Sequence, residues 1–93
     1  MIRTFASRET ERIWDGRVSR KFPSDIQNVA RRKLRMLNNA QNLNDLKAPP
    51  GNRLEALKGN RKGMHSIRIN QQWRVCFKWK DDHAFEVEIV EYH

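Results

Sequence analysis

The stretch that decides the fold is residues 53–77, RLEALKGNRKGMHSIRINQQWRVCF. Its apolar residues recur at every second position between turns that contain glycine, which is typical of consecutive antiparallel strands. We expect one buried face, formed by Ile67, Ile69, Trp73, Val75 and Phe77. Because successive side chains of a strand point to opposite faces, Arg68 and Arg74 are predicted to lie on the other face. A face that carries arginines suits the binding of phosphate groups better than ordinary contact with solvent.

The same pattern predicts four strands in the C-terminal half, at residues 53–57, 63–70, 73–80 and 84–92. Strict alternation in the last strand places Phe85, Val87 and Ile89 on the buried face. The residues predicted to share the opposite face of the sheet are Arg68, Arg74, Lys78, Glu86, Glu88 and Tyr92.

The N-terminal half is predicted to be mainly helical. Residues 2–5 are a short strand candidate that is stable only as part of the later sheet. Ser7 can cap a helix over residues 8–14, and a second helix opens at Pro23 with Ser24 as its N-cap. Its core-facing stripe consists of Ile26, Val29, Ala30, Leu34 and Leu37. The chain is therefore expected to be an α+β fold, with two N-terminal helices packed on one face of an antiparallel sheet of three to four strands.

Composition limits the partners of the chain. Its 93 residues fit a single domain, residues 1–93, and carry 19 Lys and Arg against 11 Asp and Glu, a net charge of +8. This charge favours an anionic partner, and the absence of an apolar run of about 20 residues argues against a membrane anchor. The first residues do not resemble a signal peptide, and Cys76 has no second cysteine with which to form a disulfide. We expect a cytoplasmic protein in which Cys76 is a buried structural thiol.

The sequence shows no metal site and no cofactor motif. His65, His83 and His93 lack the spacing of metal ligands, and the segment from Gly59 to Gly63 lacks the Lys-Ser or Lys-Thr of a phosphate loop. Metal-independent RNA cleavage, in contrast, needs only a proton acceptor, a proton donor and cations beside the phosphate. The candidate proton carriers are Tyr92, His93, Glu91 and Glu55, and the candidate phosphate ligands are Arg68, Arg74 and Lys58.

Three motifs resemble a known family. The run from Leu57 to Ile67, with Lys58-Gly59-Asn60-Arg61, is followed by Trp73-Arg74-Val75 and by the closing Glu91-Tyr92-His93. Together these motifs resemble the HigB branch of the RelE-like toxins. The resemblance covers nearly the whole chain and implies a toxin that cleaves mRNA in the ribosomal A site. It also implies neutralisation by a helix-turn-helix, HigA-like antitoxin, in a complex expected to be a heterotetramer.

The resemblance assigns roles to particular positions. The family's site residues correspond to Lys58, Arg74, Tyr92 and His93, to which Glu91 is added as a catalytic candidate. The expected RNA-binding residues are Arg68, Arg61, Glu55 and Lys78. Some members of the family have histidine in place of Glu55 and aspartate in place of Glu91. Because an ionised carboxylate can accept a proton but cannot donate one, the sequence leaves open which group is the general acid.

Two other functions remain open at this stage. The ParE toxins share the expected architecture but inhibit DNA gyrase and cleave no RNA. A non-catalytic RNA-binding protein would also account for the net charge. For the antitoxin, the sequence offers two basic contact surfaces, the helix near residues 31–35 and the loop at residues 17–21.

Overall fold

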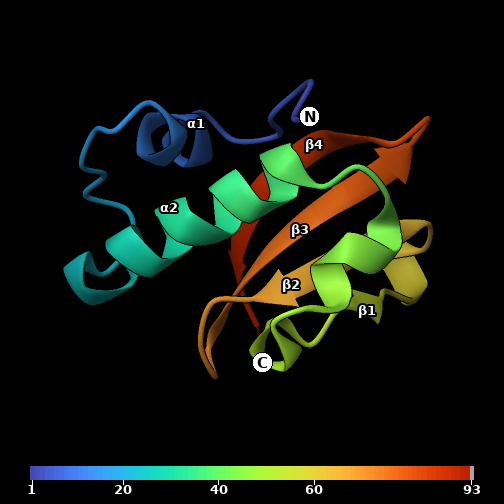
Figure 1. Ribbon diagram of the computed structural model, residues 1–93. Coiled ribbons are helices and arrows are strands. Elements are labelled where there is room, and N and C mark those ends of the chain that lie inside the picture. Colours follow the sequence, from blue (N-terminus) through green and yellow to red (C-terminus); the bar gives the residue numbers. More distant parts are fainter. Residues whose placement is uncertain (93) are drawn as a thin grey trace.

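A computed structural model describes residues 1–92 of the chain, so His93, a predicted catalytic residue, lies outside the described residues. Two helices, α1 (Arg8–Trp14) and α2 (Ser24–Asn39), precede the strands β1 (Glu55–Ala56), β2 (Met64–Arg68), β3 (Trp73–Lys80) and β4 (His83–Glu91). The strands form one antiparallel sheet in the order β1-β2-β3-β4, with α2 lying across it (Figure 1). The α+β prediction is confirmed.

The helices begin where the sequence provides starting signals. Ser7 caps α1, because its Oγ accepts a hydrogen bond of 3.2 Å from the backbone N–H of Thr10. The predicted cap of α2 is wrong by one residue, since Pro23 occupies the N-cap position and Ser24 is the first helical residue. The proline ring fixes φ at −54° and its carbonyl accepts the first helical bond, from Ile26. Within residues 1–92 no helix has the length and apolar character that crossing a membrane requires.

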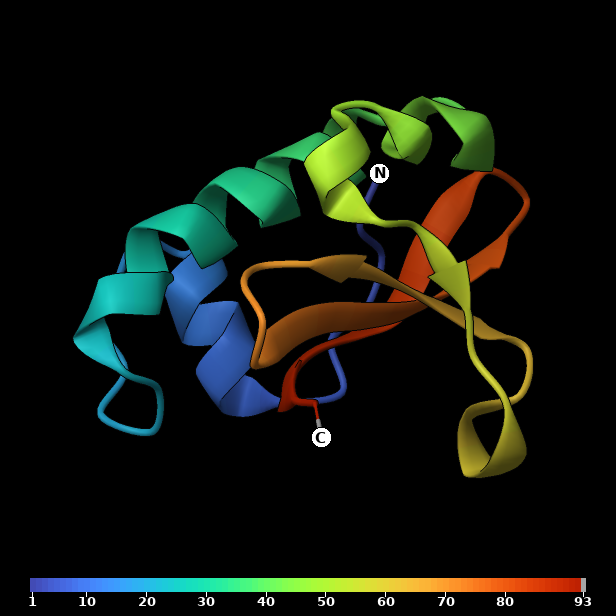
Figure 2. The same ribbon diagram turned by 90° about the horizontal axis from the view of Figure 1, so that it is seen from below.

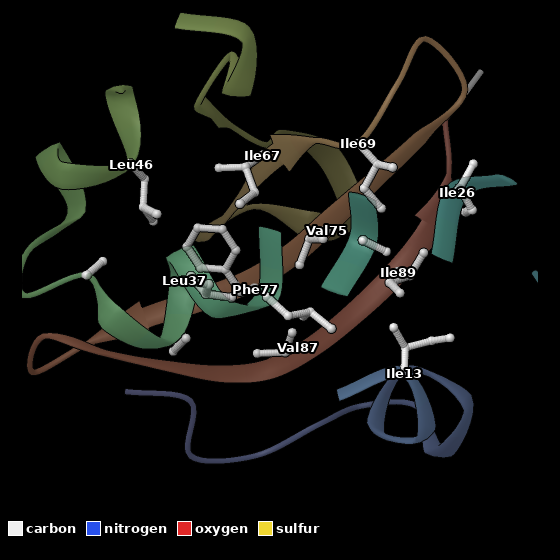
Figure 3. Close-up of a cluster of buried hydrophobic side chains, with 14 of the residues drawn as sticks. Ile13, Ile26, Leu37, Leu46, Ile67, Ile69, Val75, Phe77, Val87 and Ile89 are labelled. Atoms are coloured by element: carbon white, nitrogen blue, oxygen red, sulfur yellow. The ribbon is translucent and has the colours of Figure 1, made fainter. Parts of the chain in front are cut away.

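The core lies between one face of the sheet and the two helices. Val75, Phe77 and Val87 point from the sheet toward α2 and α1 and are fully buried (Figure 3). The predicted stripe of α2 meets them, with Leu34 and Leu37 completely inaccessible to solvent. Figure 2 shows the packing of the elements from below, with the helix α2 lying on one side of the strand β3. Trp73 is half-buried at the margin of this cluster, where its ring meets Phe22 edge-on with 5.6 Å between the ring centroids.

The prediction that Phe85 belongs to the buried face is wrong. Cys76 pairs with Glu88, but Lys78 pairs with Phe85, so β4 has one more residue than β3 in this interval. This β-bulge includes Glu86, whose φ of 53° lies in the left-handed region. Ala84 therefore occupies the core position and Phe85 joins Lys78 on the face away from the helices.

The boundaries of the other predicted strands also differ from the structure, except for β3: β2 is shorter than the predicted 63–70 and β4 is displaced by one residue from the predicted 84–92. The first strand contains only Glu55–Ala56, because Arg53 takes a left-handed conformation with φ 45° that interrupts an extended chain. Residues 2–5 form isolated parallel bridges, from Ile2 to Ala84 and from Phe5 to Val87. This N-terminal segment covers the outer edge of β4, as a short strand that joins the sheet would.

Phe77 provides a direct test of the core. Replacing Phe77 by alanine is expected to reduce the free energy of unfolding by about 3–5 kcal/mol, since a fully buried ring is lost and a cavity remains. Urea denaturation followed by circular dichroism measures the change. Val18→Ala, at a side chain that is 70% exposed, is the control and should change stability by less than about 0.5 kcal/mol. Equal effects of the two substitutions would contradict the proposed core.

Candidate active site

Arg74 is the centre of a group of polar side chains on the face of the sheet away from the helices. It is only 9% exposed, which is unusual for an arginine and requires partners for its guanidinium. Its Nη1 donates hydrogen bonds to Ser66 Oγ at 2.9 Å and to the Arg53 carbonyl at 3.4 Å. Its Nη2 lies 3.5 Å from a carboxylate oxygen of Glu55. These contacts fix the plane of the guanidinium in the free protein.

Tyr92, the residue that follows β4, covers the guanidinium of Arg74. The centroid of its ring lies 4.7 Å from the Arg74 guanidinium carbon, a distance at which a cation interacts favourably with the face of an aromatic ring. The phenol donates a hydrogen bond of 3.1 Å to Glu55 Oε1. Arg74, Glu55 and Tyr92 therefore form a closed triangle of contacts, referred to below as the Arg74 cluster.

Strand register explains how three distant parts of the sequence meet here. Glu55 of β1 pairs with Ser66 of β2, and Ser66 in turn pairs with Cys76 of β3. The backbone N–H of Tyr92 donates to the Gln72 carbonyl at 2.6 Å, which continues the pairing of β3 and β4 beyond Glu91. A shift of one residue in either pairing would turn one member of the cluster to the opposite face.

The environment of Tyr92 favours its protonated form. The hydrogen bond to Glu55, and then the negative charge of that carboxylate, raise the pKa of the Tyr92 phenol, while the positive charge of Arg74 acts in the opposite direction. Tyr92 is thus a neutral hydrogen-bond donor at physiological pH. This state suits a general acid and does not suit a general base.

Because Tyr92 is the only tyrosine of the chain, its titration can be followed by tyrosinate absorbance alone. The absorbance of the folded protein should rise at a higher pH than in the urea-unfolded protein, whose phenol titrates near its ordinary pKa of about 10. Because the pKa of Tyr92 is raised in the folded state, the Tyr92 phenol contributes fully to stability at pH values below its unfolded pKa of about 10. The contribution is lost as the pH rises through the folded pKa. Glu55→Gln should move the folded midpoint toward the unfolded one, and an unchanged midpoint would contradict the Tyr92–Glu55 contact.

The other predicted site residues lie around the cluster or apart from it. Arg68 is the cross-strand partner of Arg74 and is also one of the residues that line a groove beside α2. Arg61 forms an ion pair of 3.6 Å with Glu88 on the same face as Cys76. Lys78 lies four residues from Arg74 along β3, on the same face.

Lys58 and Glu91 are not brought into the Arg74 cluster. Lys58 is exposed in the turn after β1, and within residues 1–92 its side chain makes no hydrogen bond or ion pair. Glu91 pairs with Trp73 and so points to the face opposite Tyr92, where it accepts a hydrogen bond of 2.6 Å from Gln72 Nε2. The catalytic roles assigned to these two residues remain predictions from the sequence.

One residue of the site was not recognised in the sequence. Ser66 is fully buried and accepts the shortest hydrogen bond of Arg74. The signal for it is present but weak, since a serine inside an apolar strand, next to a strand that carries an arginine on the same face, suggests a buried hydrogen bond. Glu55, predicted as a candidate proton carrier and as an RNA-binding residue, lies between the guanidinium and the phenol. No three His, Cys, Asp or Glu side chains of residues 1–92 gather as a metal site requires.

Comparison with known proteins places this chain in a family. A family model described as the RelE-like toxin of the type II toxin-antitoxin system HigB matches residues 3–93. The chain belongs to this HigB family. One relative of this HigB-family toxin is Toxin HigB-1 of Vibrio cholerae, which is 51% identical over 67 residues, covering 72% of the chain and 70% of the relative. An uncharacterized protein of Haemophilus influenzae is 40% identical over 62 residues, 67% of the chain and 61% of that protein.

Solved structures agree with the fold of the HigB-family toxin. A YoeB–YefM complex from Staphylococcus aureus contains a chain that matches with a TM-score of 0.62 at 18% identity, covering 100% of this chain and 98% of that one. YafQ from E. coli strain BL21(DE3) matches with a TM-score of 0.61 at 15% identity, covering 98% and 93%. At these identities the likeness establishes the fold alone. The chain is thus a toxin of the HigB type with a RelE-like fold.

Proposed function

We propose that this HigB-family toxin is a ribosome-dependent endonuclease that cleaves mRNA in the ribosomal A site by general acid-base chemistry, without a metal ion or cofactor. The observation that supports this proposal best is the Arg74 cluster, which joins a proton acceptor, a proton donor and a cation by direct contacts. The Glu55 side chain is 45% exposed and Tyr92 is 38% exposed, so an RNA strand can approach both from solvent.

In the proposed reaction Glu55 accepts the proton of a ribose 2′-hydroxyl. The 2′-oxygen forms a bond to the neighbouring phosphorus, and the bond from phosphorus to the 5′-oxygen breaks. Tyr92, whose phenol is protonated in the free protein, donates its proton to that leaving oxygen. Arg74 neutralises the extra negative charge that develops on the phosphate oxygens, a contribution that is larger in a site partly closed to water. The products are a 2′,3′-cyclic phosphate and a 5′-hydroxyl end.

The hydrogen bond between Tyr92 and Glu55 would also restore the site. After one turnover Glu55 holds a proton and Tyr92 has lost one. Their oxygens lie 3.1 Å apart in the free protein, so the proton can pass back directly once the products have left. The substrate phosphate must separate these two groups when it binds. The ribosome would contribute by holding the message in the required position, since positioning alone can lower a barrier by several kcal/mol.

We further propose an acidic antitoxin as the regulatory partner. The family belongs to a type II toxin-antitoxin system, and a similar fold occurs in a heterotetrameric YoeB–YefM toxin-antitoxin complex. Of the cations near residues 31–35, Arg31 donates to the Ile13 and Arg17 carbonyls and Lys33 donates to Asn52. Arg32 and Arg35 are exposed on α2 and are the better candidates for contact with acidic residues of a HigA-like partner.

The proposed function predicts that cleavage depends on the ribosome. Purified toxin is expected to cut mRNA bound to programmed ribosomes and to leave the same mRNA intact in their absence. Primer extension on the message locates the cuts. A DNA gyrase supercoiling assay with the same preparation should show no inhibition. Inhibition of gyrase together with intact mRNA would reject the proposal in favour of a gyrase inhibitor.

A further inference from the structure

A hollow lies on the face of the sheet away from the helices, at the end of β3 and β4 remote from the Arg74 cluster. It is lined by Thr4, Lys78, Lys80, Asp81, Phe85 and Glu86 and has a volume of about 360 Å³. We call it the Phe85 hollow. None of these residues contributes to the Arg74 cluster, and the proposed reaction does not use them.

The bulge in β4 turns Phe85 into this hollow. A regular strand would place Phe85 in the core with Val87, where burial of its ring would stabilise the fold. The extra residue instead pairs Phe85 with Lys78 on the outer face, outside the core cluster. The bulge also requires Glu86 to take a φ of 53°, which is unfavourable for a residue with a side chain. Bulges that re-aim a side chain in this way are frequent beside functional sites.

The groups around Phe85 match the parts of a nucleotide. Lys78 and Lys80 are exposed, and within residues 1–92 neither forms an ion pair. They can bind a phosphate group, while an aromatic ring offers a surface on which a base of any sequence stacks. The carboxylates of Asp81 and Glu86 can accept hydrogen bonds from the amino group of adenine or cytosine. A ring flanked by both cations and acceptors suits a nucleotide better than it suits a simple anion.

We propose that the Phe85 hollow is a nucleotide-binding subsite, in which a base of the RNA strand stacks on Phe85 and a phosphate group binds Lys78 and Lys80. The proposal rests on the proposed endonuclease function and extends it to a part of the RNA that is not cleaved. Lys78 lies four residues from Arg74 along one strand, a separation of about 13 Å at the usual rise per residue. One extended RNA strand can therefore contact both places at once.

Binding of adenosine 5′-monophosphate tests the subsite without the ribosome. Addition of this nucleotide to isotope-labelled toxin should shift the NMR amide signals of residues 78–86, and inorganic phosphate should produce smaller shifts at higher concentration. Phe85→Leu keeps an apolar side chain but removes the ring, and is expected to weaken nucleotide affinity about tenfold. The affinity for inorganic phosphate should not change with this substitution.

The lysine contribution is tested with a matched pair of variants. Lys78→Gln removes one charge from the hollow and should weaken the binding of both probes. Lys47→Gln removes one charge from an exposed position in the turn at residues 43–47 and should leave both affinities unchanged. Thermal melting of each variant establishes that it is folded before its affinity is compared. Equal effects of Lys78→Gln and Lys47→Gln would overturn the phosphate contact.

The outcomes separate this subsite from the proposed function. Toxin that cleaves mRNA on ribosomes but whose residues 78–86 do not respond to the nucleotide would overturn the subsite and leave the endonuclease intact. Toxin that binds the nucleotide at Phe85 but never cleaves mRNA would overturn the endonuclease instead. If Phe85→Leu binds the nucleotide as tightly as the wild-type protein, the stacking contact is wrong. If inorganic phosphate produces the same shifts at the same concentration, the hollow is an anion-binding site alone and the base does not contribute.

Discussion

Arg74→Ala is expected to slow mRNA cleavage on programmed ribosomes by about 100-fold to 1000-fold, the range seen when one donor to a developing oxyanion is removed. Arg74 has four contacts that fix its guanidinium before substrate arrives, to Ser66, to the Arg53 carbonyl, to Glu55 and to the ring of Tyr92. Alanine removes the charge and this fixed geometry together. The rate of disappearance of full-length message in a single turnover measures the effect.

Two further substitutions make this result interpretable. Arg74→Lys retains the positive charge but cannot reach Ser66 and Glu55 with a planar fork, so its rate should lie between those of the wild type and the alanine variant. Arg8→Ala removes an exposed arginine at the start of α1 and should cleave at the wild-type rate. An Arg74→Ala protein that is folded by circular dichroism and still cleaves at the wild-type rate would eliminate Arg74 from the chemistry.

Tyr92→Phe is expected to slow cleavage by about 100-fold through kcat, with little change in KM. Phenylalanine keeps the ring over Arg74 and removes only the hydroxyl that bonds to Glu55. Loss of the proton donor therefore affects the chemical step while substrate binding is retained. Tyr92→Ala should lower the rate further, because Arg74 also loses the aromatic surface that covers it.

A different result for Tyr92→Phe would change the assignment of the general acid. If kcat is unchanged while Tyr92→Ala is impaired, the ring acts only as a support for Arg74 and another group donates the proton. Because the phenol is exposed at the surface, neither substitution should alter the melting temperature appreciably.

Periodicity in the sequence predicted most of the fold for a clear physical reason. The helix at residues 8–14 and the strand at residues 73–80 have the predicted boundaries, because each has strong signals at both ends. The alternation of Arg74 with Val75 correctly placed the arginine opposite the core. The contact of Arg74 with Tyr92 depends on this alternation and on the register of β4, and both follow from the buried apolar set.

The parts that the sequence did not predict involve backbone conformations that leave little trace in composition. The bulge at Glu86 adds one residue to β4, and no glycine or asparagine in this part of the sequence indicates its presence. Strict alternation consequently placed Phe85 in the core. Similarly, the left-handed Arg53 precedes β1, so the strand begins later than predicted, and the Arg53 carbonyl accepts a hydrogen bond from Arg74. Glu91 was predicted as a proton carrier from its chemistry and from the closing motif, and because neighbours in a strand face opposite ways its side chain lies on the face away from Tyr92.

The most direct test of the Arg74 cluster as an acid-base site is the chemistry of the cleaved message. An mRNA with a single 2′-deoxy nucleotide on the 5′ side of the mapped cut is placed on programmed ribosomes with wild-type toxin. The proposed mechanism predicts no cleavage at that bond, and 2′,3′-cyclic phosphate ends on the unmodified control message. Cleavage of the 2′-deoxy message at the same position and rate would contradict attack by the 2′-oxygen and, with it, the roles assigned to Glu55 and Tyr92.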